Sequence, residues 1–132
     1  MKEISIRTNL PVEMIDITSF VRTALKEKNV ESGYCIVFTP HTTAAVTINE
    51  NADPDVPRDI ISALEKAVPQ NAPYRHSEGN SPAHVKSSLV GASETVLIEN
   101  GRLVLGTWQS IFFCEFDGPR SRRVIIKVVK SD

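Results

Sequence analysis

The sequence has few cysteines, no long apolar run and no excess of charge of one sign. Two cysteines in 132 residues are too few for a disulfide framework. Both lie within apolar segments, so we expect Cys35 and Cys114 to be reduced core residues. No apolar run approaches the roughly 18–20 residues that cross a bilayer, and the N-terminal residues alternate instead of forming the apolar segment of a signal peptide. We therefore expect a cytoplasmic protein with no membrane partner.

Charge and composition exclude two further classes. The formal net charge is −1, without the basic patch that binds nucleic acid, so we expect no nucleic-acid partner. The hydrophobic share of 41% and the charged share of 23% are those of ordinary globular chains, which argues against disorder. The length suits a single domain, residues 1–132, that buries a core without disulfides or structural metals.

The pattern of apolar residues predicts both strands and helices. Alternation and β-branched residues predict strands over 2–8, 13–17, 34–39, 44–48, 93–98, 102–105, 107–116 and 122–129. Apolar residues at helical spacing predict three helices, which follow the capping residues Thr18, Asp53 and Ser81 and run to about 29, 68 and 89. Asn100-Gly101 is typical of a tight hairpin turn. We expect one compact α+β domain with a largely antiparallel or mixed sheet.

The last two predicted strands carry apolar residues on both faces. In residues 107–116, Ile111 and Phe113 point to one side, whereas Phe112, Cys114 and Phe116 point to the other. A sheet in a small domain usually exposes one face to water, and three short helices are unlikely to cover both. This pattern predicts a homo-oligomer that packs sheet faces or strand edges between subunits.

The three histidines lie in polar segments that the strand and helix patterns do not require. His41 follows a predicted strand, and His76 and His84 flank the start of the third helix. Neutral imidazoles are good ligands for divalent metals, and three such ligands with an open position occur in catalytic zinc sites. The spacing fits no compact zinc motif, so a shared site would have to be assembled by folding. The alternative is that these are ordinary loop histidines that form hydrogen bonds.

The start of the third helix has properties that suit an anion. If Ser81 caps this helix, His84 lies in its first turn, where the helix dipole disfavours an added proton. Backbone N–H groups near Gly79, Asn80 and Ser81 would be available to a phosphate. A plain turn followed by a cap is the alternative for each residue alone. Their position between two histidines favours a functional role.

Glu115 is unusual because a carboxylate within Phe-Phe-Cys-Glu-Phe must find a partner when buried. An ion pair with Arg120 or Arg122 is one explanation. Acid–base catalysis, or support of a metal-bound histidine, is the other. We expect Trp108 to lie in the core or in a pocket wall, whereas Gln109 beside it is harder to explain by packing and is a candidate ligand-binding residue.

Five motifs together resemble the YjbQ family of small proteins over essentially the whole chain. They are Thr39 to Thr43, Asn49 to Pro54, His76 to Ser81 with His84, Gly106 to Gln109, and Glu115 to Arg120. The resemblance implies a compact α+β fold that forms a homotrimer with the motif residues near subunit interfaces. It also implies thiamine-phosphate synthase activity, a secondary activity that joins a pyrimidine methyl pyrophosphate to a thiazole phosphate and releases pyrophosphate.

The resemblance and the residue chemistry together define the candidate site. The predicted roles are catalysis by Glu50, Glu115 and Arg120; substrate binding by Thr42, Asn49, Gly79, Asn80, Ser81, Trp108 and Gln109; and metal binding by His41, His76 and His84. We expect a divalent metal, zinc first, or magnesium with a pyrophosphate substrate. Two alternatives remain open: a metal-dependent hydrolase of a phosphorylated or amide substrate with Glu50 activating water, and a trimeric protein that binds a small molecule or metal without turnover.

Overall fold

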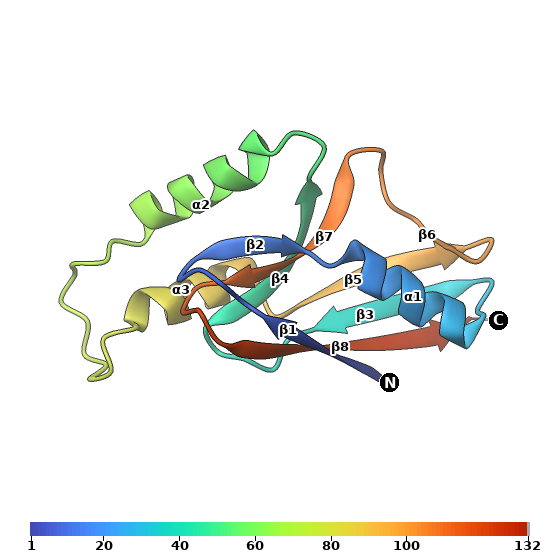
Figure 1. Cartoon of the computed structure of the whole chain (residues 1–132), viewed down its shortest axis with the longest axis horizontal. Helices are drawn as coiled ribbons and strands as arrows, with labels where there is room; N and C mark the ends of the chain where they lie inside the picture. The colour runs from blue at the N-terminus through green and yellow to red at the C-terminus, as the bar shows by residue number, and fades with distance from the viewer. Residues whose placement is uncertain (132) are drawn as a thin grey trace.

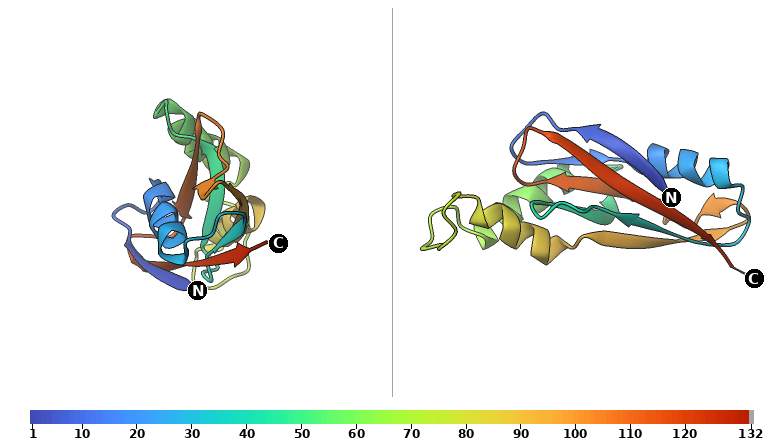
Figure 2. Two further views of the ribbon diagram at one scale, coloured as in Figure 1. Left: turned by 90° about the vertical axis from the view of Figure 1, so that its right-hand side faces the viewer. Right: turned by 90° about the horizontal axis from the view of Figure 1, so that it is seen from below.

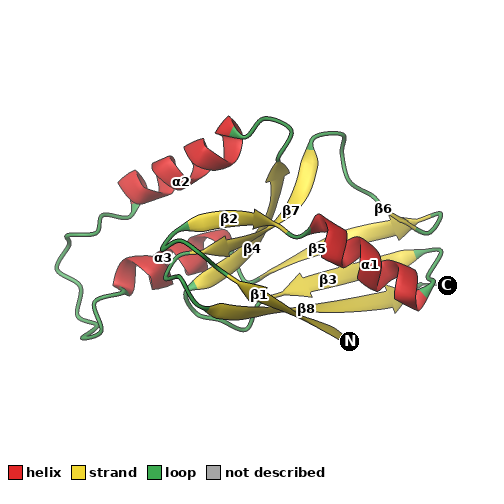
Figure 3. Ribbon diagram, viewed as in Figure 1, coloured by secondary structure: helices red, strands yellow, loops and turns green. Residues whose placement is uncertain are grey.

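The computed structural model describes residues 1–131, and it confirms the predicted α+β domain (Figures 1 and 3). In this range the chain forms eight strands and three helices, close to the predicted segments. In order they are β1 (Lys2–Arg7), β2 (Glu13–Asp16), α1 (Thr18–Lys28), β3 (Gly33–Phe38), β4 (Ala44–Glu50), α2 (Asp55–Ala67), α3 (Ser81–Val90), β5 (Ser93–Glu99), β6 (Arg102–Leu103), β7 (Gln109–Glu115) and β8 (Ser121–Lys130).

The strands form two sheets, and every strand pair that the structure describes is antiparallel. One sheet has the order β1-β8-β3-β5-β6, and the other has the order β2-β7-β4. The two sheets lie face to face, and α1 closes one end of the space between them (Figure 2). Because both sheets turn one face inward, alternate residues of most strands meet in a shared core.

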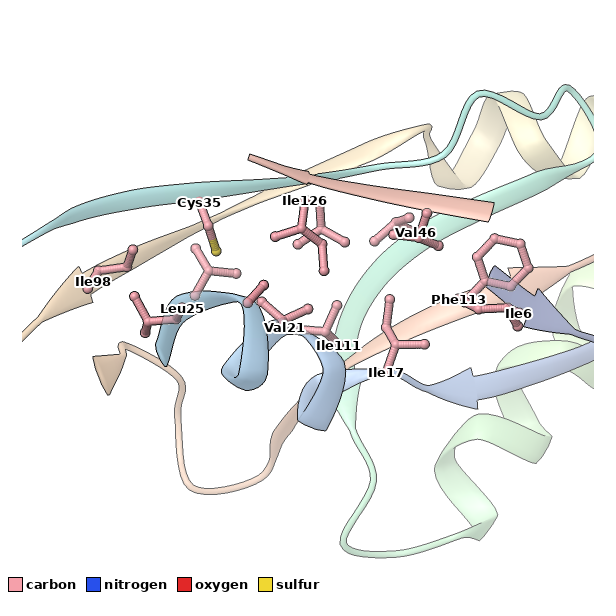
Figure 4. Packing of buried hydrophobic residues seen from close by; sticks show 14 of the residues in the cluster. Ile6, Ile17, Val21, Leu25, Cys35, Val46, Ile98, Ile111, Phe113 and Ile126 are labelled. Atoms are coloured by element: carbon pink, nitrogen blue, oxygen red, sulfur yellow. The ribbon is translucent and has the colours of Figure 1, made fainter. Parts of the chain in front are cut away.

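The main core fills the space between the two sheets and α1. Val21, Ala24 and Leu25 of α1 are buried against Cys35 of β3 and Ile126 of β8 (Figure 4). The short repeat of Val21, Ala24 and Leu25 is the three- and four-residue spacing that places side chains on one helical face. This face explains why residues 18–28 form an amphipathic helix at this place in the fold.

A second, smaller apolar cluster lies on the outer face of the three-stranded sheet. Phe112 and Cys114 of β7 pack there with Ala83 of α3, and α2 reaches over them (Figure 1). No residue of α2 is buried, however. Both faces of β7 are therefore covered within one chain. The two-sided apolar pattern of residues 107–116 thus has an intramolecular cause, and it does not require a partner subunit.

The outer face of the five-stranded sheet is open and partly apolar. Tyr34 of β3 is paired with Leu97 of β5, and Phe38 lies four residues further along the same face. Their side chains are 37%, 61% and 39% exposed, respectively. This face offers the predicted homo-oligomer an apolar contact surface.

At each of the three helices, the residue in the capping position lies one residue away from the cap that the sequence predicted. The residues in the capping position are Ile17, Pro54 and Asn80, so the predicted caps Thr18 and Ser81 are wrong and are the first helical residues instead. Asp53 lies one residue before the cap and still accepts the Asp55 amide at 2.9 Å.

Of the other local predictions, some are confirmed and one strand is shorter than predicted. The Asn100-Gly101 turn is confirmed, since both residues have positive φ, but the strand after it is two residues long instead of four. Both cysteines are buried free thiols, and burial raises the pKa of Cys35 to about 11 and that of Cys114 to about 12. Within the described residues, no helix is long and apolar enough to cross a membrane.

Candidate functional site

The three histidines, which are far apart in the sequence, line one pocket of about 410 Å³. His41 lies in the loop between β3 and β4, His76 lies in the loop between α2 and α3, and His84 lies in the first turn of α3. Helix α3 packs along β4, and the Ser87 hydroxyl donates a hydrogen bond to the Ala44 carbonyl at 2.6 Å. This packing brings His84 to the start of β4 and hence to His41. The pocket is also lined by Pro40, Thr42, Thr43, Glu78, Asn80, Arg120 and Arg122.

His41 is fixed by the end of β8. The backbone N–H of Arg123 donates to its Nε2 at 3.0 Å, so the ring carries its proton on Nδ1. Burial lowers the pKa of His41, and the nearby guanidinium groups of Arg122 and Arg123 lower it further, although Glu115 acts in the opposite direction. The imidazole is therefore held neutral, with Nδ1–H as its free donor.

His76 and His84 face each other at the opposite side of the pocket. Their ring centroids are 5.3 Å apart and the ring planes are almost perpendicular, at 89°. His76 Nε2 also lies 3.9 Å from a carboxylate oxygen of Glu78. These two rings and Glu78 supply polar groups that are not committed to backbone structure.

The three histidines do not form a metal-ligand set within this chain. Across residues 1–131, no group of three histidine, cysteine, aspartate or glutamate side chains lies close enough to share an ion. The Nε2 lone pair of His41 is already taken by the Arg123 amide. A metal held by His41, His76 and His84 would require His41 to turn or a second subunit to supply ligands.

Arg120 is anchored at the edge of the pocket by the turn after β7. Its Nη2 donates to a carboxylate oxygen of Asp117 at 2.9 Å and its Nε donates to the Asp117 carbonyl at 2.8 Å. Gly118 is needed in this turn, because a Cβ there would lie 2.4 Å from the Leu10 carbonyl oxygen. Half of the Arg120 side chain stays exposed, so its remaining N–H groups are available to an anion.

Glu115 is completely buried, and its partner is Arg122. Arg122 Nε donates to the carboxylate at 2.9 Å, Thr8 donates its hydroxyl at 2.7 Å and the Asp117 amide donates at 3.0 Å. Burial alone raises the pKa of Glu115, but these hydrogen bonds outweigh it and hold the pKa below its usual range. Of the two partners considered from the sequence, the structure selects Arg122. Glu115 reaches the pocket only through Arg122, which also donates to the Thr43 hydroxyl at 2.8 Å.

The remaining predicted residues lie at the far end of the three-stranded sheet. The β4–β7 register pairs Ala44 with Glu115 at the histidine end and Glu50 with Gln109 at the other end, six residues along the strand. At about 3.4 Å per residue the two ends are about 20 Å apart. Asn49 and Trp108 accompany Glu50 and Gln109. The single chain therefore does not bring these four residues to the histidine pocket.

Two of these far-end residues, Gln109 and Trp108, have surroundings that the sequence did not indicate. Gln109 accepts the Gly106 amide at 2.8 Å and so closes its own turn. Trp108 is 62% exposed, so it does not lie in the core, and its place in a pocket wall stays a prediction. It belongs to the turn between β6 and β7.

The segment before α3 divides between two pockets. Thr42 and Asn80 line the histidine pocket, whereas Gly79 lines a different pocket on the other side of α3, which Asn80 lines as well. The Gly79 amide is already directed to the His76 carbonyl at 3.4 Å, and Ser81 lines neither pocket. Thr43 and Glu78 are pocket residues that sequence reasoning did not select, although each is adjacent to a selected residue.

The fold and the pocket define a small α+β protein with histidines and an arginine gathered at the start of one helix. The chain belongs to the UPF0047 (YjbQ-like) family, whose model matches residues 2–131. It is 52% identical over 130 residues to the UPF0047 protein YugU of Bacillus subtilis, with 98% of each chain covered. A crystal structure of a YjbQ/UPF0047 protein from Clostridium acetobutylicum superposes with a TM-score of 0.96 at 53% identity, covering 98% of this chain and 100% of that one.

A more distant relative has the same fold. The protein TT1486 from Thermus thermophilus is 40% identical and superposes with a TM-score of 0.90, covering 98% of this chain and 100% of that one. The two-sheet arrangement that holds the histidine pocket is thus the fold of the family.

Proposed function

We propose that this chain is an enzyme that acts on a small phosphorylated substrate, with the activity of a thiamine-phosphate synthase. The observation that carries the proposal is the gathering of three histidines and Arg120, from separate segments, in one pocket at the start of α3. Imidazole N–H groups, a guanidinium and a helix N-terminus are all suited to the oxygens of a phosphate or pyrophosphate.

In the proposed reaction the pocket binds the leaving pyrophosphate. The thiazole nitrogen attacks the methylene carbon of the pyrimidine substrate, the bond from that carbon to the pyrophosphate oxygen breaks, and its electron pair leaves with the pyrophosphate. The Arg120 guanidinium balances the charge on the departing oxygens, and the neutral His41 donates a hydrogen bond to them from Nδ1. Arg122, held by Glu115, keeps its guanidinium at the base of the pocket.

The homotrimer stays a prediction, and it bears directly on the function. Asn49, Glu50, Trp108 and Gln109 lie about 20 Å from the histidines of the same chain. A second subunit is therefore the source from which such residues would reach a neighbour's pocket, and a hydrolase with Glu50 as its base would need this arrangement. Light scattering on the purified protein tests it, and a monomer at micromolar concentration would contradict it.

The divalent metal also stays a prediction, since the histidines of one chain do not form its ligand set. If zinc is bound between subunits, mass spectrometry of tag-free protein will find about one ion per chain. The ion should be lost when His41, His76 and His84 are all replaced by alanine with the oligomeric state unchanged. Magnesium that arrives with pyrophosphate would instead be part of the substrate, and the purified protein would then be metal-free.

The activity is tested by pyrophosphate release that depends on both thiamine precursors, with thiamine phosphate identified by mass spectrometry. Arg120→Gln should lower kcat/KM about 100-fold, because it removes a donor to the leaving group. Arg58→Gln is the matched control, since Arg58 also pairs with an aspartate three residues away but lies on α2 outside the pocket. If pyrophosphate raises the melting temperature but no product forms, the protein binds without turnover and the enzymatic proposal fails.

A further inference from the structure

Lys86 of α3 is a buried lysine with no anionic partner. Its side chain is 5% exposed, and its ammonium lies 5.9 Å from the centroid of the Phe116 ring. This ammonium forms no hydrogen bond and no ion pair with residues 1–131. An aromatic face offsets only part of the cost of partly desolvating an ammonium. The Lys86 ammonium keeps some contact with solvent, and no carboxylate of the described residues pairs with it.

The ammonium has room for a counter-ion. Lys86 lines a pocket of about 460 Å³ between α3, the end of α2 and the turn after β7, on the opposite side of α3 from His84. Apolar walls come from Val12, Val68 and Phe116, and the exposed Glu65 lies at the rim. The volume is that of a small-molecule site.

A second polar group in the same pocket also lacks a partner. The side-chain oxygen of Asn80 is buried without a hydrogen bond in the described part of the chain, whereas its nitrogen donates to Asp117 at 3.0 Å. Buried acceptors are almost always paired in folded proteins. Lys86, whose ammonium has no anionic partner, and Asn80, whose side-chain oxygen has no donor, therefore both line this cavity, and Asn80 also lines the histidine pocket.

We propose that this pocket is a second binding site, for a small organic anion that also carries an N–H or O–H group. The acidic group pairs with Lys86, the donor binds the Asn80 oxygen, and an apolar or aromatic body lies against Phe116. Glu65 and Asp117 disfavour a ligand with a second acidic group at its other end. The proposal does not depend on the synthase reaction, because the two pockets share only Asn80 among their lining residues.

The test uses 4-aminobenzylphosphonate, which joins an anion, a ring and an N–H donor, and compares it with benzylphosphonate and inorganic phosphate. Calorimetry on the full-length protein should give a Kd below about 1 mM for the amino compound. The affinity should be several-fold lower without the amino group, and lowest for phosphate. Lys86→Met should weaken binding about tenfold or more. Lys28→Met, at an exposed lysine of α1, should leave the affinity unchanged.

Two results would overturn the proposal. One is no binding of 4-aminobenzylphosphonate to the wild-type protein at 1 mM or above. The other is binding that Lys86→Met leaves intact and that a His76→Ala variant abolishes, which would assign the probe to the histidine pocket. Because Lys86→Met can alter folding, the wild-type protein is also mapped by NMR. Amide shifts centred on Asn80, Lys86 and Phe116 support the site, and shifts confined to His41 and Arg123 contradict it.

Discussion

The two sides of the three-stranded sheet are packed very differently. Fifteen residues are buried in the cluster between the sheets and α1, and five are buried in the cluster beneath α2 and α3. Helix α1 contributes four buried residues, whereas the longer α2 contributes none. The outer side also contains two pockets, of about 460 and 340 Å³, whereas a pocket of about 300 Å³ lies beside α1 at the edge of the inner cluster.

The difference shows that an amphipathic pattern predicts which face of a helix turns inward, but not how tightly it packs. Val56, Ile60, Ile61 and Leu64 give α2 an apolar stripe, yet each is only half-buried. Dispersion contacts are lost wherever a cavity replaces a neighbouring atom. We therefore expect the α1 side to supply most of the stability and the α2 side to adjust to ligands.

The largest expected effect comes from Phe113, which has a matched control beside it. Phe113 and Phe112 are neighbours on β7 and are 0% and 1% exposed, but they face the inner and the outer cluster, respectively. Phe113→Ala should cost about 4 kcal/mol of unfolding free energy, and Phe112→Ala about half as much, because Phe112 already borders a pocket. Urea unfolding measures both. Equal losses would show that the outer layer is packed as tightly as the inner one.

The ion pair at the end of the inner core provides the next effect. Glu115→Gln should cost about 3 kcal/mol at pH 7, because Arg122 is left buried without its counter-charge. The pKa of Glu115 is lower in the folded protein than its ordinary value of 4.5. Its contribution is therefore complete above pH 4.5 and is lost as the pH falls below that value.

The pH dependence of the unfolding free energy separates the effect of the lost charge from the effect of altered packing. Wild-type stability should fall more steeply than that of Glu115→Gln below pH 4.5, so that the difference between the two proteins narrows. Thermal unfolding between pH 3 and pH 7 follows both proteins, and parallel curves would assign the loss to packing instead of charge.

The smallest expected effect is a difference in local opening. Amide hydrogens of α2 should exchange at least about tenfold faster than those of α1, since few contacts hold α2 to the sheet. Hydrogen exchange followed by mass spectrometry compares the two helices in one experiment. Equal protection of the two helices would mean that α2 opens only when the whole domain unfolds. The looser packing beneath α2 would then not make this helix more mobile than α1.

Most of the fold could be predicted because its signals are local. Strand β1 follows from the alternation of Ile4 and Ile6 with polar residues, and the hairpin of β5 and β6 follows from Asn100-Gly101. The helix starts were displaced by one residue. At α1 the Thr18 hydroxyl donates to Asp16 and accepts the Ile111 amide, so it does not cap the helix that follows it. Contacts of this kind depend on the geometry of the folded chain.

The site was harder to predict, because it depends on register and packing. The residues of the histidine pocket were found largely from their polar motifs, but their separation from Glu50 and Gln109 follows from the antiparallel β4–β7 pairing. Lys86 was not singled out from the sequence. Its three- and four-residue spacing from Ala83 and Val90, both in the outer cluster, is the signal that places it on the buried face.

One oxygen atom of Asp117 joins the two pockets. It accepts a hydrogen bond from the Asn80 side chain at 3.0 Å and another from Arg120 at 2.9 Å. A ligand that moves Asn80 leaves this oxygen to Arg120, and an anion that draws Arg120 away leaves it to Asn80. Where binding in one pocket changes either hydrogen bond, each ligand alters the dissociation constant of the other by the same factor. The turn after β7 is therefore the place where binding at the two faces of α3 would be coupled.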